Sequence, residues 1–309
     1  MAIGTRLFRS ALLAMAGNRA AEALALKYGL RLGARQFVAG ETREEALDKV
    51  RDLNRKGIEA TLDHLGEGIR RMSEAEAYKQ EYVRLLEGIR AAGVRSNVSL
   101  KPTQMGLALD PDAAYANIRE IVAAADRCGN FVRIDMEDSP HTDATIGIAR
   151  RLHGKGLTNV GTVIQAYLYR SEDDIRRLTA EPMNLRLVKG AYKEPKSLAY
   201  PRKPDVDANF RRLAKARLRS GVYTAIATHD ETIIRELRLF ARREGIDGSA
   251  YEFQMLYGIR SALQEQLAAE GCRVRCYVPY GRMWYPYFVR RLAERPANAA
   301  FLIRNWIRG

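Results

Sequence analysis

Short apolar runs alternate with longer amphipathic stretches along most of the chain. From Ile58 onward, eight short runs predict strands: Glu59–Leu65, Asn97–Lys101, Phe131–Asp135, Thr162–Ala166, Leu185–Lys189, Thr224–Thr228, Ala250–Met255 and Arg273–Val278. Helical spacing predicts helices before and between them: 44–56, 73–92, Pro111–Cys128, Glu172–Thr179, Ala208–Ser220, Glu231–Glu244 and Arg260–Glu270. Eight such units over about 225 residues predict an α/β fold, a distorted (βα)8 barrel of the TIM type.

The first 57 residues lack this alternation and predict a helical layer added to a barrel domain over 58–309. Residues 1–30 contain three arginines and no acidic residue before Glu22, a composition that transit peptides share. The apolar stretch Ala11–Ala16 is too short for a secretory signal core. Because Leu7, Ala11 and Met15 fall at helical spacing, an integral amphipathic helix is the simpler interpretation.

Composition excludes several classes of protein. The 309 residues are 47% hydrophobic, which permits a large core, and no apolar run approaches the roughly 20 residues that span a bilayer. The 51 basic and 37 acidic residues give a net charge of +14. Because the basic residues are dispersed among acidic ones and form no basic patch in the sequence, we expect no nucleic-acid partner. Loose contact with an acidic membrane leaflet stays open. Three cysteines and four scattered histidines predict neither a disulfide scaffold nor a metal site, and they fit the cytoplasm.

Polar residues recur at or near the ends of the predicted strands. Glu67, Lys101 and Asp135 are 34 residues apart, and Gln165 follows 30 residues later. Lys189, Thr228, His229 and Tyr277 continue the series. Active sites of this fold lie at the C-terminal ends of the strands, so we expect these side chains to surround one barrel mouth.

The fifth predicted strand places cations on both of its faces. Arg186 shares one face with Val188, and Lys189 lies on the other face with Leu187. A charged side chain in a barrel strand needs a ligand, water or an opposite charge, so ligand binding and internal salt bridges both stay open. After the strand, Gly190-Ala191 would let a bulky ligand lie against bare backbone.

Two further segments could bind anions. Thr228 and His229 precede a predicted helix, whose N-terminal amides suit a phosphate. The last predicted helix, Tyr285–Glu294, carries Tyr287, Arg290 and Arg291 on one stripe with Glu294. Two adjacent guanidiniums can clamp a carboxylate, although a solvated face with an Arg290–Glu294 pair explains the spacing equally well.

Seven segments in order resemble the proline dehydrogenase family in its short, monofunctional form. They are LDHLGE (62–67), LKPTQMG (100–106), RIDMED (133–138), RLVKGAY (186–192), ATHD (227–230), YEFQMLYG (251–258) and YVPYG…YFVRRLAE (277–294). The resemblance runs from about Glu59 to Asn305. It implies a barrel that holds FAD and oxidises L-proline to Δ1-pyrroline-5-carboxylate, with electrons passing to a membrane quinone. A pyrroline-5-carboxylate dehydrogenase would take the product.

The resemblance also implies roles for individual residues. Lys101, Arg290 and Arg291 would grip the substrate carboxylate, and Asp135 and Arg186 would line the reaction centre, with Arg186 near the flavin N5 atom. Tyr277 and Tyr287 would pack around the proline ring, while Glu67 would pair with Arg290 over the bound substrate. The implied flavin contacts are Met136, Val163, Gln165, Arg186, Val188, Lys189, Gly190, Ala191, Thr228 and His229. Asp230 departs from the pattern, because related sequences commonly carry asparagine there.

Other classes remain as alternatives. A Schiff-base aldolase barrel would use Lys189 as its nucleophile. A folate-dependent or other flavin-dependent barrel oxidoreductase would differ in not being reduced by proline. No strand is followed by G-x-G-x-x-G, so a Rossmann mode of cofactor binding is not expected, and the barrel mouth would have to hold the FAD.

Overall fold

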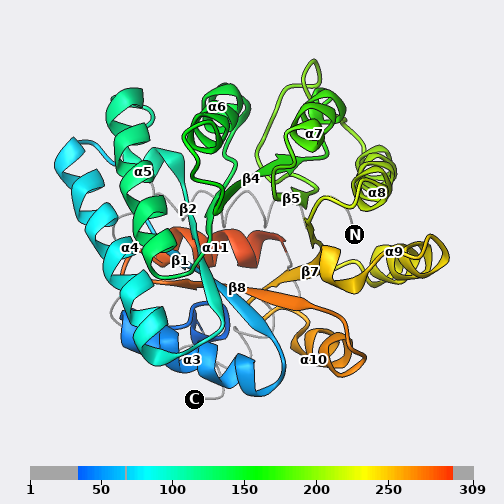
Figure 1. The fold of residues 1–309 in the computed structure, drawn as a ribbon, viewed down its shortest axis with the longest axis horizontal. Helices are drawn as coiled ribbons and strands as arrows, with labels where there is room; N and C mark the ends of the chain where they lie inside the picture. Colours follow the sequence, from blue (N-terminus) through cyan, green and yellow to red (C-terminus); the bar gives the residue numbers. More distant parts are fainter. Residues whose placement is uncertain (1–33, 67, 295–309) are drawn as a thin grey trace.

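Eight parallel strands close into a barrel in the computed structural model, which describes residues 34–66 and 68–294 (Figure 1). The strands are β1 (Glu59–His64), β2 (Ser96–Leu100), β3 (Val132–Ile134), β4 (Val160–Gln165), β5 (Leu185–Val188), β6 (Thr224–Ala227), β7 (Tyr251–Leu256) and β8 (Val274–Tyr280). Each pairs with its neighbours in sequence, and β8 closes the ring on β1. Every predicted strand is confirmed, with ends that lie within two residues of the prediction.

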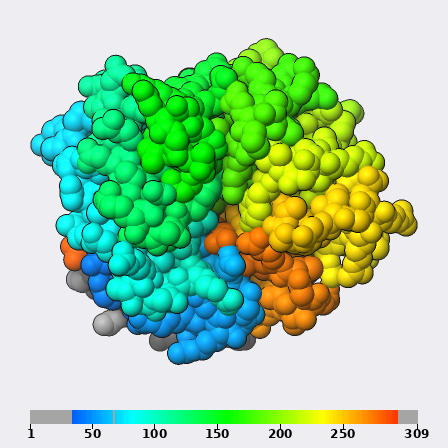
Figure 2. Space-filling model, in the orientation of Figure 1, coloured from blue at the N-terminus to red at the C-terminus, as the bar shows by residue number. Residues whose placement is uncertain are grey.

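Helices surround the barrel in chain order, so the colours follow one another round the molecule (Figure 2). They are α4 (Met72–Ala92), α5 (Pro111–Arg127), α6 (Thr142–His153), α7 (Ser171–Ala180), α8 (Lys203–Arg219), α9 (Glu231–Arg243) and α10 (Ser261–Ala269). Short 3-10 turns lie at η1 (Ala34–Gln36), η2 (Pro102–Met105), η3 (Ser139–His141) and η4 (Gly248–Ala250). The helix α6 was not predicted. Within the described residues, no helix combines the length and hydropathy needed to cross a membrane.

An early helix covers the outer side of the β8–β1 seam. This helix, α3 (Arg43–Arg55), begins with a reciprocal capping box, in which Thr42 accepts from the backbone of Glu45 and Glu45 accepts from the backbone of Thr42. Its buried residues include Leu47 and Val50, which join the main core. In this protein α3 packs on the outside of β8, because the helix that follows β8 in the sequence does not pack there.

That last helix, α11 (Tyr285–Glu294), lies at the C-terminal end of the barrel, and Figure 1 shows it across the centre of the ring. It packs in a cluster of its own, separate from the main core, where Trp284 and Val289 meet Phe37, Leu65 and Ile259. Leu65 and Ile259 come just after β1 and β7, so the cluster fastens α11 over the ends of those strands. The predicted bounds of this helix are confirmed.

The two faces of the strands differ in chemistry. Outward residues such as Leu62, Leu100 and Ile134 are fully buried in the main core against the helices. Many of the inward positions carry polar side chains: Glu59, Thr61, Asp63, Ser99, Arg133, Arg186, Glu252, Gln254, Arg275 and Tyr277. Side chains of β5 reach β2 and β7, which are not its neighbours, and only the barrel interior allows such contacts.

Candidate active site

Arg186 is the centre of a polar cluster inside the barrel. Its Nη1 forms a 2.5 Å ion pair with Oδ1 of Asp135, which follows β3. Its Nη2 donates to Oγ of Ser99 at 3.0 Å, and its Nε donates to Oε1 of Gln254 at 2.5 Å. The guanidinium therefore meets one negative acceptor from the loop after β3 and two neutral acceptors from β2 and β7, in a place where its side chain is only 6% exposed. A buried cation with this many directional partners is held in a single orientation.

Asp135 joins this arginine to a tyrosine of the last strand. The hydroxyl of Tyr277 donates to Oδ2 of Asp135 at 2.9 Å, while the Arg186 guanidinium lies 5.4 Å from the centre of the Tyr277 ring. Burial raises the pKa of Asp135 above its ordinary value, against the opposing effect of Arg186. Burial and the nearby carboxylates hold the pKa of Tyr277 well above its ordinary value, so the phenol stays a hydrogen-bond donor.

Lys101 lies at the end of β2 with its ammonium directed to the first strand. Its Nζ is 3.2 Å from Oδ2 of Asp63, and its side chain is 11% exposed. Asp63 also accepts from the hydroxyl of Tyr82 at 3.3 Å. Ser99, which contacts Arg186, bonds Thr61 at 3.0 Å, so the two cations are linked through β1 and β2.

The arginine pair of the last helix is partly shielded from solvent. Arg290 and Arg291 are half-buried on α11, and Tyr287 on the preceding turn is buried. The Arg291 guanidinium lies 5.1 Å from the centre of the Tyr287 ring. This partial burial at the barrel end differs from the fully solvated face that the sequence left open. Glu67, the expected partner of Arg290, lies outside the described residues, as does the side chain of Glu294.

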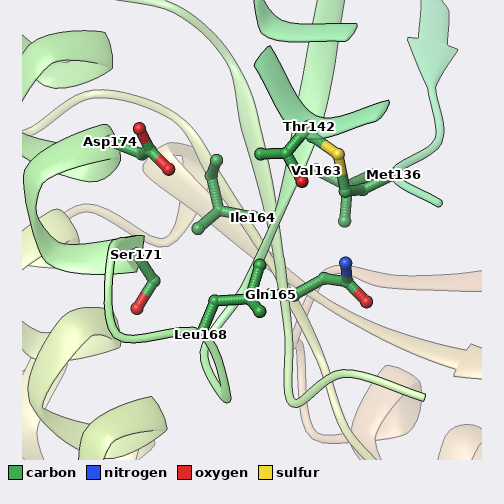
Figure 3. Close-up of a pocket in the computed structure, with 8 residues that line it drawn as sticks. All are labelled: Met136, Thr142, Val163, Ile164, Gln165, Leu168, Ser171 and Asp174. Atoms are coloured by element: carbon green, nitrogen blue, oxygen red, sulfur yellow. The ribbon is translucent and has the colours of Figure 1, made fainter. Parts of the chain in front are cut away.

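Three of the expected flavin contacts gather where β3 and β4 end. Figure 3 shows Met136 and Gln165 on one side of β4, with Ile164 on the other. Val163 shares the inward face with Gln165 because strand residues alternate. The amide of Gln165 donates from Nε2 to the backbone oxygen of Glu137 at 2.8 Å, which ties the end of β4 to the loop after β3.

Lys189 follows β5 directly, and its ammonium forms ion pairs with two aspartates. Its Nζ is 2.6 Å from Oδ1 of Asp207 on α8 and 3.3 Å from Oδ2 of Asp230. Asp230 is also the N-cap of α9, where its Oδ1 accepts from the backbone of Ile233 at 3.4 Å. Although burial opposes the change, the Ile233 amide and Lys189 lower the pKa of Asp230 below its ordinary value. The negative charge at Asp230 thus caps a helix and pairs with a lysine.

The remaining expected contacts lie around β5 and β6. Val188 pairs in register with Gln165, and Gly190 and Ala191 follow directly. Gly190 has φ +112°, and a Cβ there would lie 2.2 Å from the Tyr167 ring, so that ring takes part of the space expected for a ligand. Thr228 accepts from the backbone of Asp230 at 3.2 Å, and Nε2 of His229 accepts from the backbone of Leu256 at 3.0 Å.

Sequence reasoning named Asp135, one partner of Arg186, but missed the other partners of Arg186 and the partner of Lys101. Ser99, Gln254 and Asp63 were not named as site residues, although each occupies a buried position inside the barrel. A signal for them exists in the alternation of polar and apolar residues along β1 and β7, as in Glu252-Phe253-Gln254. In ordinary barrels these inward positions carry bulky branched side chains, so polar residues there indicate chemistry.

The fold and this cluster together define a (βα)8-barrel enzyme whose buried ion pair and cationic side chains lie at or near the C-terminal ends of the strands. A site with this charge suits a small substrate that carries a carboxylate.

Comparison with known proteins gives the family. A family model described as proline dehydrogenase matches residues 46–304. Proline dehydrogenase of Deinococcus radiodurans is 46% identical over 98% of this chain and 99% of its own length, and proline dehydrogenase 1 of Bacillus subtilis is 45% identical over 97% and 99%. The chain belongs to the proline dehydrogenase family, which is flavin-dependent, and it is an enzyme with proline dehydrogenase activity.

A solved structure supports the same fold. Proline utilization A from Bdellovibrio bacteriovorus, inactivated by N-propargylglycine, has a TM-score of 0.80 and 26% sequence identity. The match covers 87% of this chain and 33% of that longer protein. The expected barrel is therefore confirmed both by the strand order and by a structural relative.

Proposed function

We propose that L-proline is oxidised to Δ1-pyrroline-5-carboxylate at the cluster around Arg186, with FAD as the electron acceptor. The observation that carries this proposal is the buried Arg186–Asp135 pair, joined to Tyr277 inside a barrel of this family. FAD, when bound, accepts two electrons as a hydride at its N5 atom. The side chains of the site then have to position the proline ring and keep its nitrogen uncharged.

The donor set of the mouth fits FAD. Arg186 supplies charged N–H groups near the axis, and Met136 and Val163 supply buried apolar contacts. An anionic diphosphate would lie best where Lys189 and the N-terminus of α9 meet, at the other end of the same row of loops. Lys189 would then share its charge among the diphosphate, Asp207 and Asp230.

The substrate carboxylate would be held by cations from two elements of the mouth. Lys101 comes from β2, and Arg290 and Arg291 come from α11. Charge-assisted and bidentate contacts fix both position and orientation. Tyr287 is buried beside Arg291, and the half-buried ring of Tyr277 lies beside Arg186, so the two rings would offer apolar walls for a five-membered ring.

Loss of a hydride from the ring carbon beside the neutral nitrogen would form a protonated carbon–nitrogen double bond, and the proton on that nitrogen would then pass to solvent. Only the neutral amine releases a hydride readily, and the surrounding cations disfavour an ammonium group. Asp135 would hold the Arg186 guanidinium in line with the reacting atoms. A positioned donor and acceptor at contact distance remove most of the entropic part of the barrier.

The quinone acceptor and the membrane contact are further parts of this proposal. Large exposed apolar side chains occur in loops at the C-terminal ends of the strands: Leu109, Tyr169, Tyr192, Leu198 and Met283. Such residues support peripheral contact with a bilayer, where a quinone would collect the electrons. The imine product would pass to a pyrroline-5-carboxylate dehydrogenase.

The aldolase alternative is less well supported. Lys189 lies on the face of β5 opposite to Arg186, and its ammonium is paired with carboxylates of α8 and of the α9 cap. A Schiff-base nucleophile would need access to the barrel mouth as a free amine.

Absorbance spectroscopy tests these functions directly. The purified holoenzyme should show a flavin band that bleaches when L-proline is added without oxygen. A protein without a flavin band, or one that proline does not reduce, would refute the proposal. Borohydride trapping of a substrate on Lys189 would instead support the aldolase.

A further inference from the structure

We propose that Gln254 and Glu252 are positioning residues for the oxidation step, because they fix the orientation of the Arg186 guanidinium from below. This inference rests on the proposed function, in which Arg186 lies beside the reacting atoms. It assigns a role to two side chains of β7 that face the barrel interior beneath the site.

Gln254 determines the plane of the guanidinium. Nε of Arg186 donates to Oε1 of Gln254, while the two terminal nitrogens donate to Asp135 and Ser99. A guanidinium has five N–H donors in one plane, and these three acceptors engage one donor on each nitrogen. Two N–H groups are left by these bonds for a cofactor or substrate in the same plane.

A glutamine can serve this purpose only in one of its two orientations. Arg186 is a donor alone, so the amide oxygen of Gln254 has to face it, and a reversed amide would place two N–H donors against each other. The amide nitrogen is held on the other side, where Nε2 of Gln254 donates to Oε1 of Glu252 at 2.5 Å. Because a carboxylate only accepts, Glu252 selects the orientation that suits Arg186.

Glu252 is itself fixed at the lower end of the barrel. Nε of Arg275 donates to its Oε1 at 2.8 Å, and Arg275 also pairs with Glu59 and donates to the backbone oxygen of Ala60. Although burial opposes ionisation, the charge of Arg275 lowers the pKa of Glu252 below its ordinary value, so the group remains an acceptor. Glu252, Gln254 and Arg186 therefore form one directional chain from the base of the barrel to the site.

This hydrogen-bond chain from Glu252 to Arg186 predicts an effect on the rate of flavin reduction that is separate from any effect on proline binding. Without the acceptor at Nε, the guanidinium can rotate about its bonds to Asp135 and Ser99, and the reacting atoms lose alignment. Misalignment lowers the rate of the chemical step by about 10²-fold in comparable cases. Proline affinity should change little, because the carboxylate cations of β2 and α11 are not part of the chain.

The first experiment replaces the glutamine by a side chain of the same length. Gln254→Met removes both hydrogen bonds. Gln264→Met is the control, since Gln264 is similarly buried but donates only to the backbone oxygens of Leu256, at the end of β7, and of Ile259. Rapid mixing of the holoenzymes with L-proline without oxygen measures the flavin reduction rate and the apparent proline affinity. We expect a roughly 10²-fold slower reduction in Gln254→Met at nearly unchanged affinity, and a normal rate per bound flavin in Gln264→Met.

The second experiment exchanges the two residues. In Glu252→Gln/Gln254→Glu the acceptor for Arg186 is retained, and the amide at 252 can donate to the carboxylate at 254 while accepting from Arg275. The negative charge moves two residues along the strand, about 6.6 Å nearer the site. We expect the reduction rate to lie within about tenfold of wild type, and the flavin midpoint potential to fall because a negative charge nearer the flavin disfavours reduction.

The outcomes separate this inference from the proposed function. If proline fails to reduce the wild-type flavin, the proposed function fails. If proline reduces the wild type and Gln254→Met at equal rates per bound flavin, a purely structural role explains the glutamine and this inference is overturned. If Gln254→Met does not fold, the exchanged variant decides: a reduction rate about 10²-fold below wild type there, although the acceptor at Nε of Arg186 is retained, would overturn the inference.

Discussion

The two faces of the same eight strands obey different rules. On the outer face, Leu62 and Leu100 contact helices through apolar surface, which is attractive in any orientation. On the inner face, Thr61 and Ser99 occupy neighbouring positions of the same strands and bond each other at 3.0 Å. Each inner contact needs a donor, an acceptor and a direction, so one lost partner affects the next.

This contrast shows where stability and chemistry lie in the barrel. Replacing a buried apolar residue removes contact area and lowers the free energy of unfolding. Replacing one member of a buried polar network leaves its partner unsatisfied and changes the geometry of a specific side chain. The outer face should therefore govern stability, and the inner face should govern the rate.

The largest stability effect is expected on the outer face. Leu62 is fully buried, and Leu62→Ala should lower the free energy of unfolding by about 2–5 kcal/mol, measured by denaturant titration. The rate per bound flavin should remain unchanged well below the melting temperature. Leu239→Ala is the control, because Leu239 is 47% exposed and its loss should cost less than about 0.5 kcal/mol. A rate defect without a loss of stability in Leu62→Ala would contradict the contrast.

A binding effect is expected at the end of the barrel. Arg291→Ala should raise KM for proline about 10²-fold, equivalent to about 2.7 kcal/mol, with the flavin still bound. Steady-state kinetics and the flavin absorbance measure both quantities. Arg282→Ala is the matched control, since Arg282 is exposed just before α11. A KM near that of the wild type in Arg291→Ala would remove Arg291 from the carboxylate site.

The acidic limb of the activity profile should reflect Asp135. Its folded pKa is raised, chiefly by burial, so kcat/KM should begin to fall at a higher pH than a free aspartate with pKa about 3.9 would cause. Protonation would break the ion pair with Arg186.

The effect of Asp135 on the free energy of unfolding has the opposite dependence on pH. Because its pKa is raised in the folded state, the folded state binds this proton more tightly than the unfolded state. The contribution of Asp135 to stability is therefore largest at low pH and is lost as pH rises through the raised pKa.

A pH series of kcat/KM from about pH 4 to pH 8 tests this assignment in wild type and in Asp135→Asn. The variant should be much slower and should lack the limb. A limb that persists unchanged in Asp135→Asn would assign it to another group.

The smallest effect is expected at Asp230. Asn caps helices about as well as Asp, and Asp207 would still pair with Lys189 at 2.6 Å, so Asp230→Asn should change stability by less than about 1 kcal/mol. Thermal unfolding and FAD titration measure the result. Asp207→Asn should have the larger effect, because Asp207 pairs with both Lys189 and Lys203. A greater loss in Asp230→Asn than in Asp207→Asn would show that Asp230 does more than cap and pair.

The sequence predicts the strands well because their apolar runs are short and bounded by helical patterns. The resemblance that their motifs carry led to the prediction that Asp135 and Arg186 lie in one site, and the structure brings them together at 2.5 Å. The third partner, Gln254, could not be found in this way, since β7 meets β5 only across the barrel and no local spacing records that contact. The helix α6 (Thr142–His153) was not predicted, although its buried residues Ile146, Ala149 and Leu152 follow helical spacing.

The central claim is that Arg186, oriented by the inner face, drives the oxidation of proline. Anaerobic rapid mixing of L-proline with Arg186→Met holoenzyme tests it most directly, because methionine keeps an unbranched stem and removes every donor. We predict that the variant binds flavin and that proline bleaches it at least about 10²-fold more slowly than in the wild type. Bleaching at the wild-type rate would contradict the account.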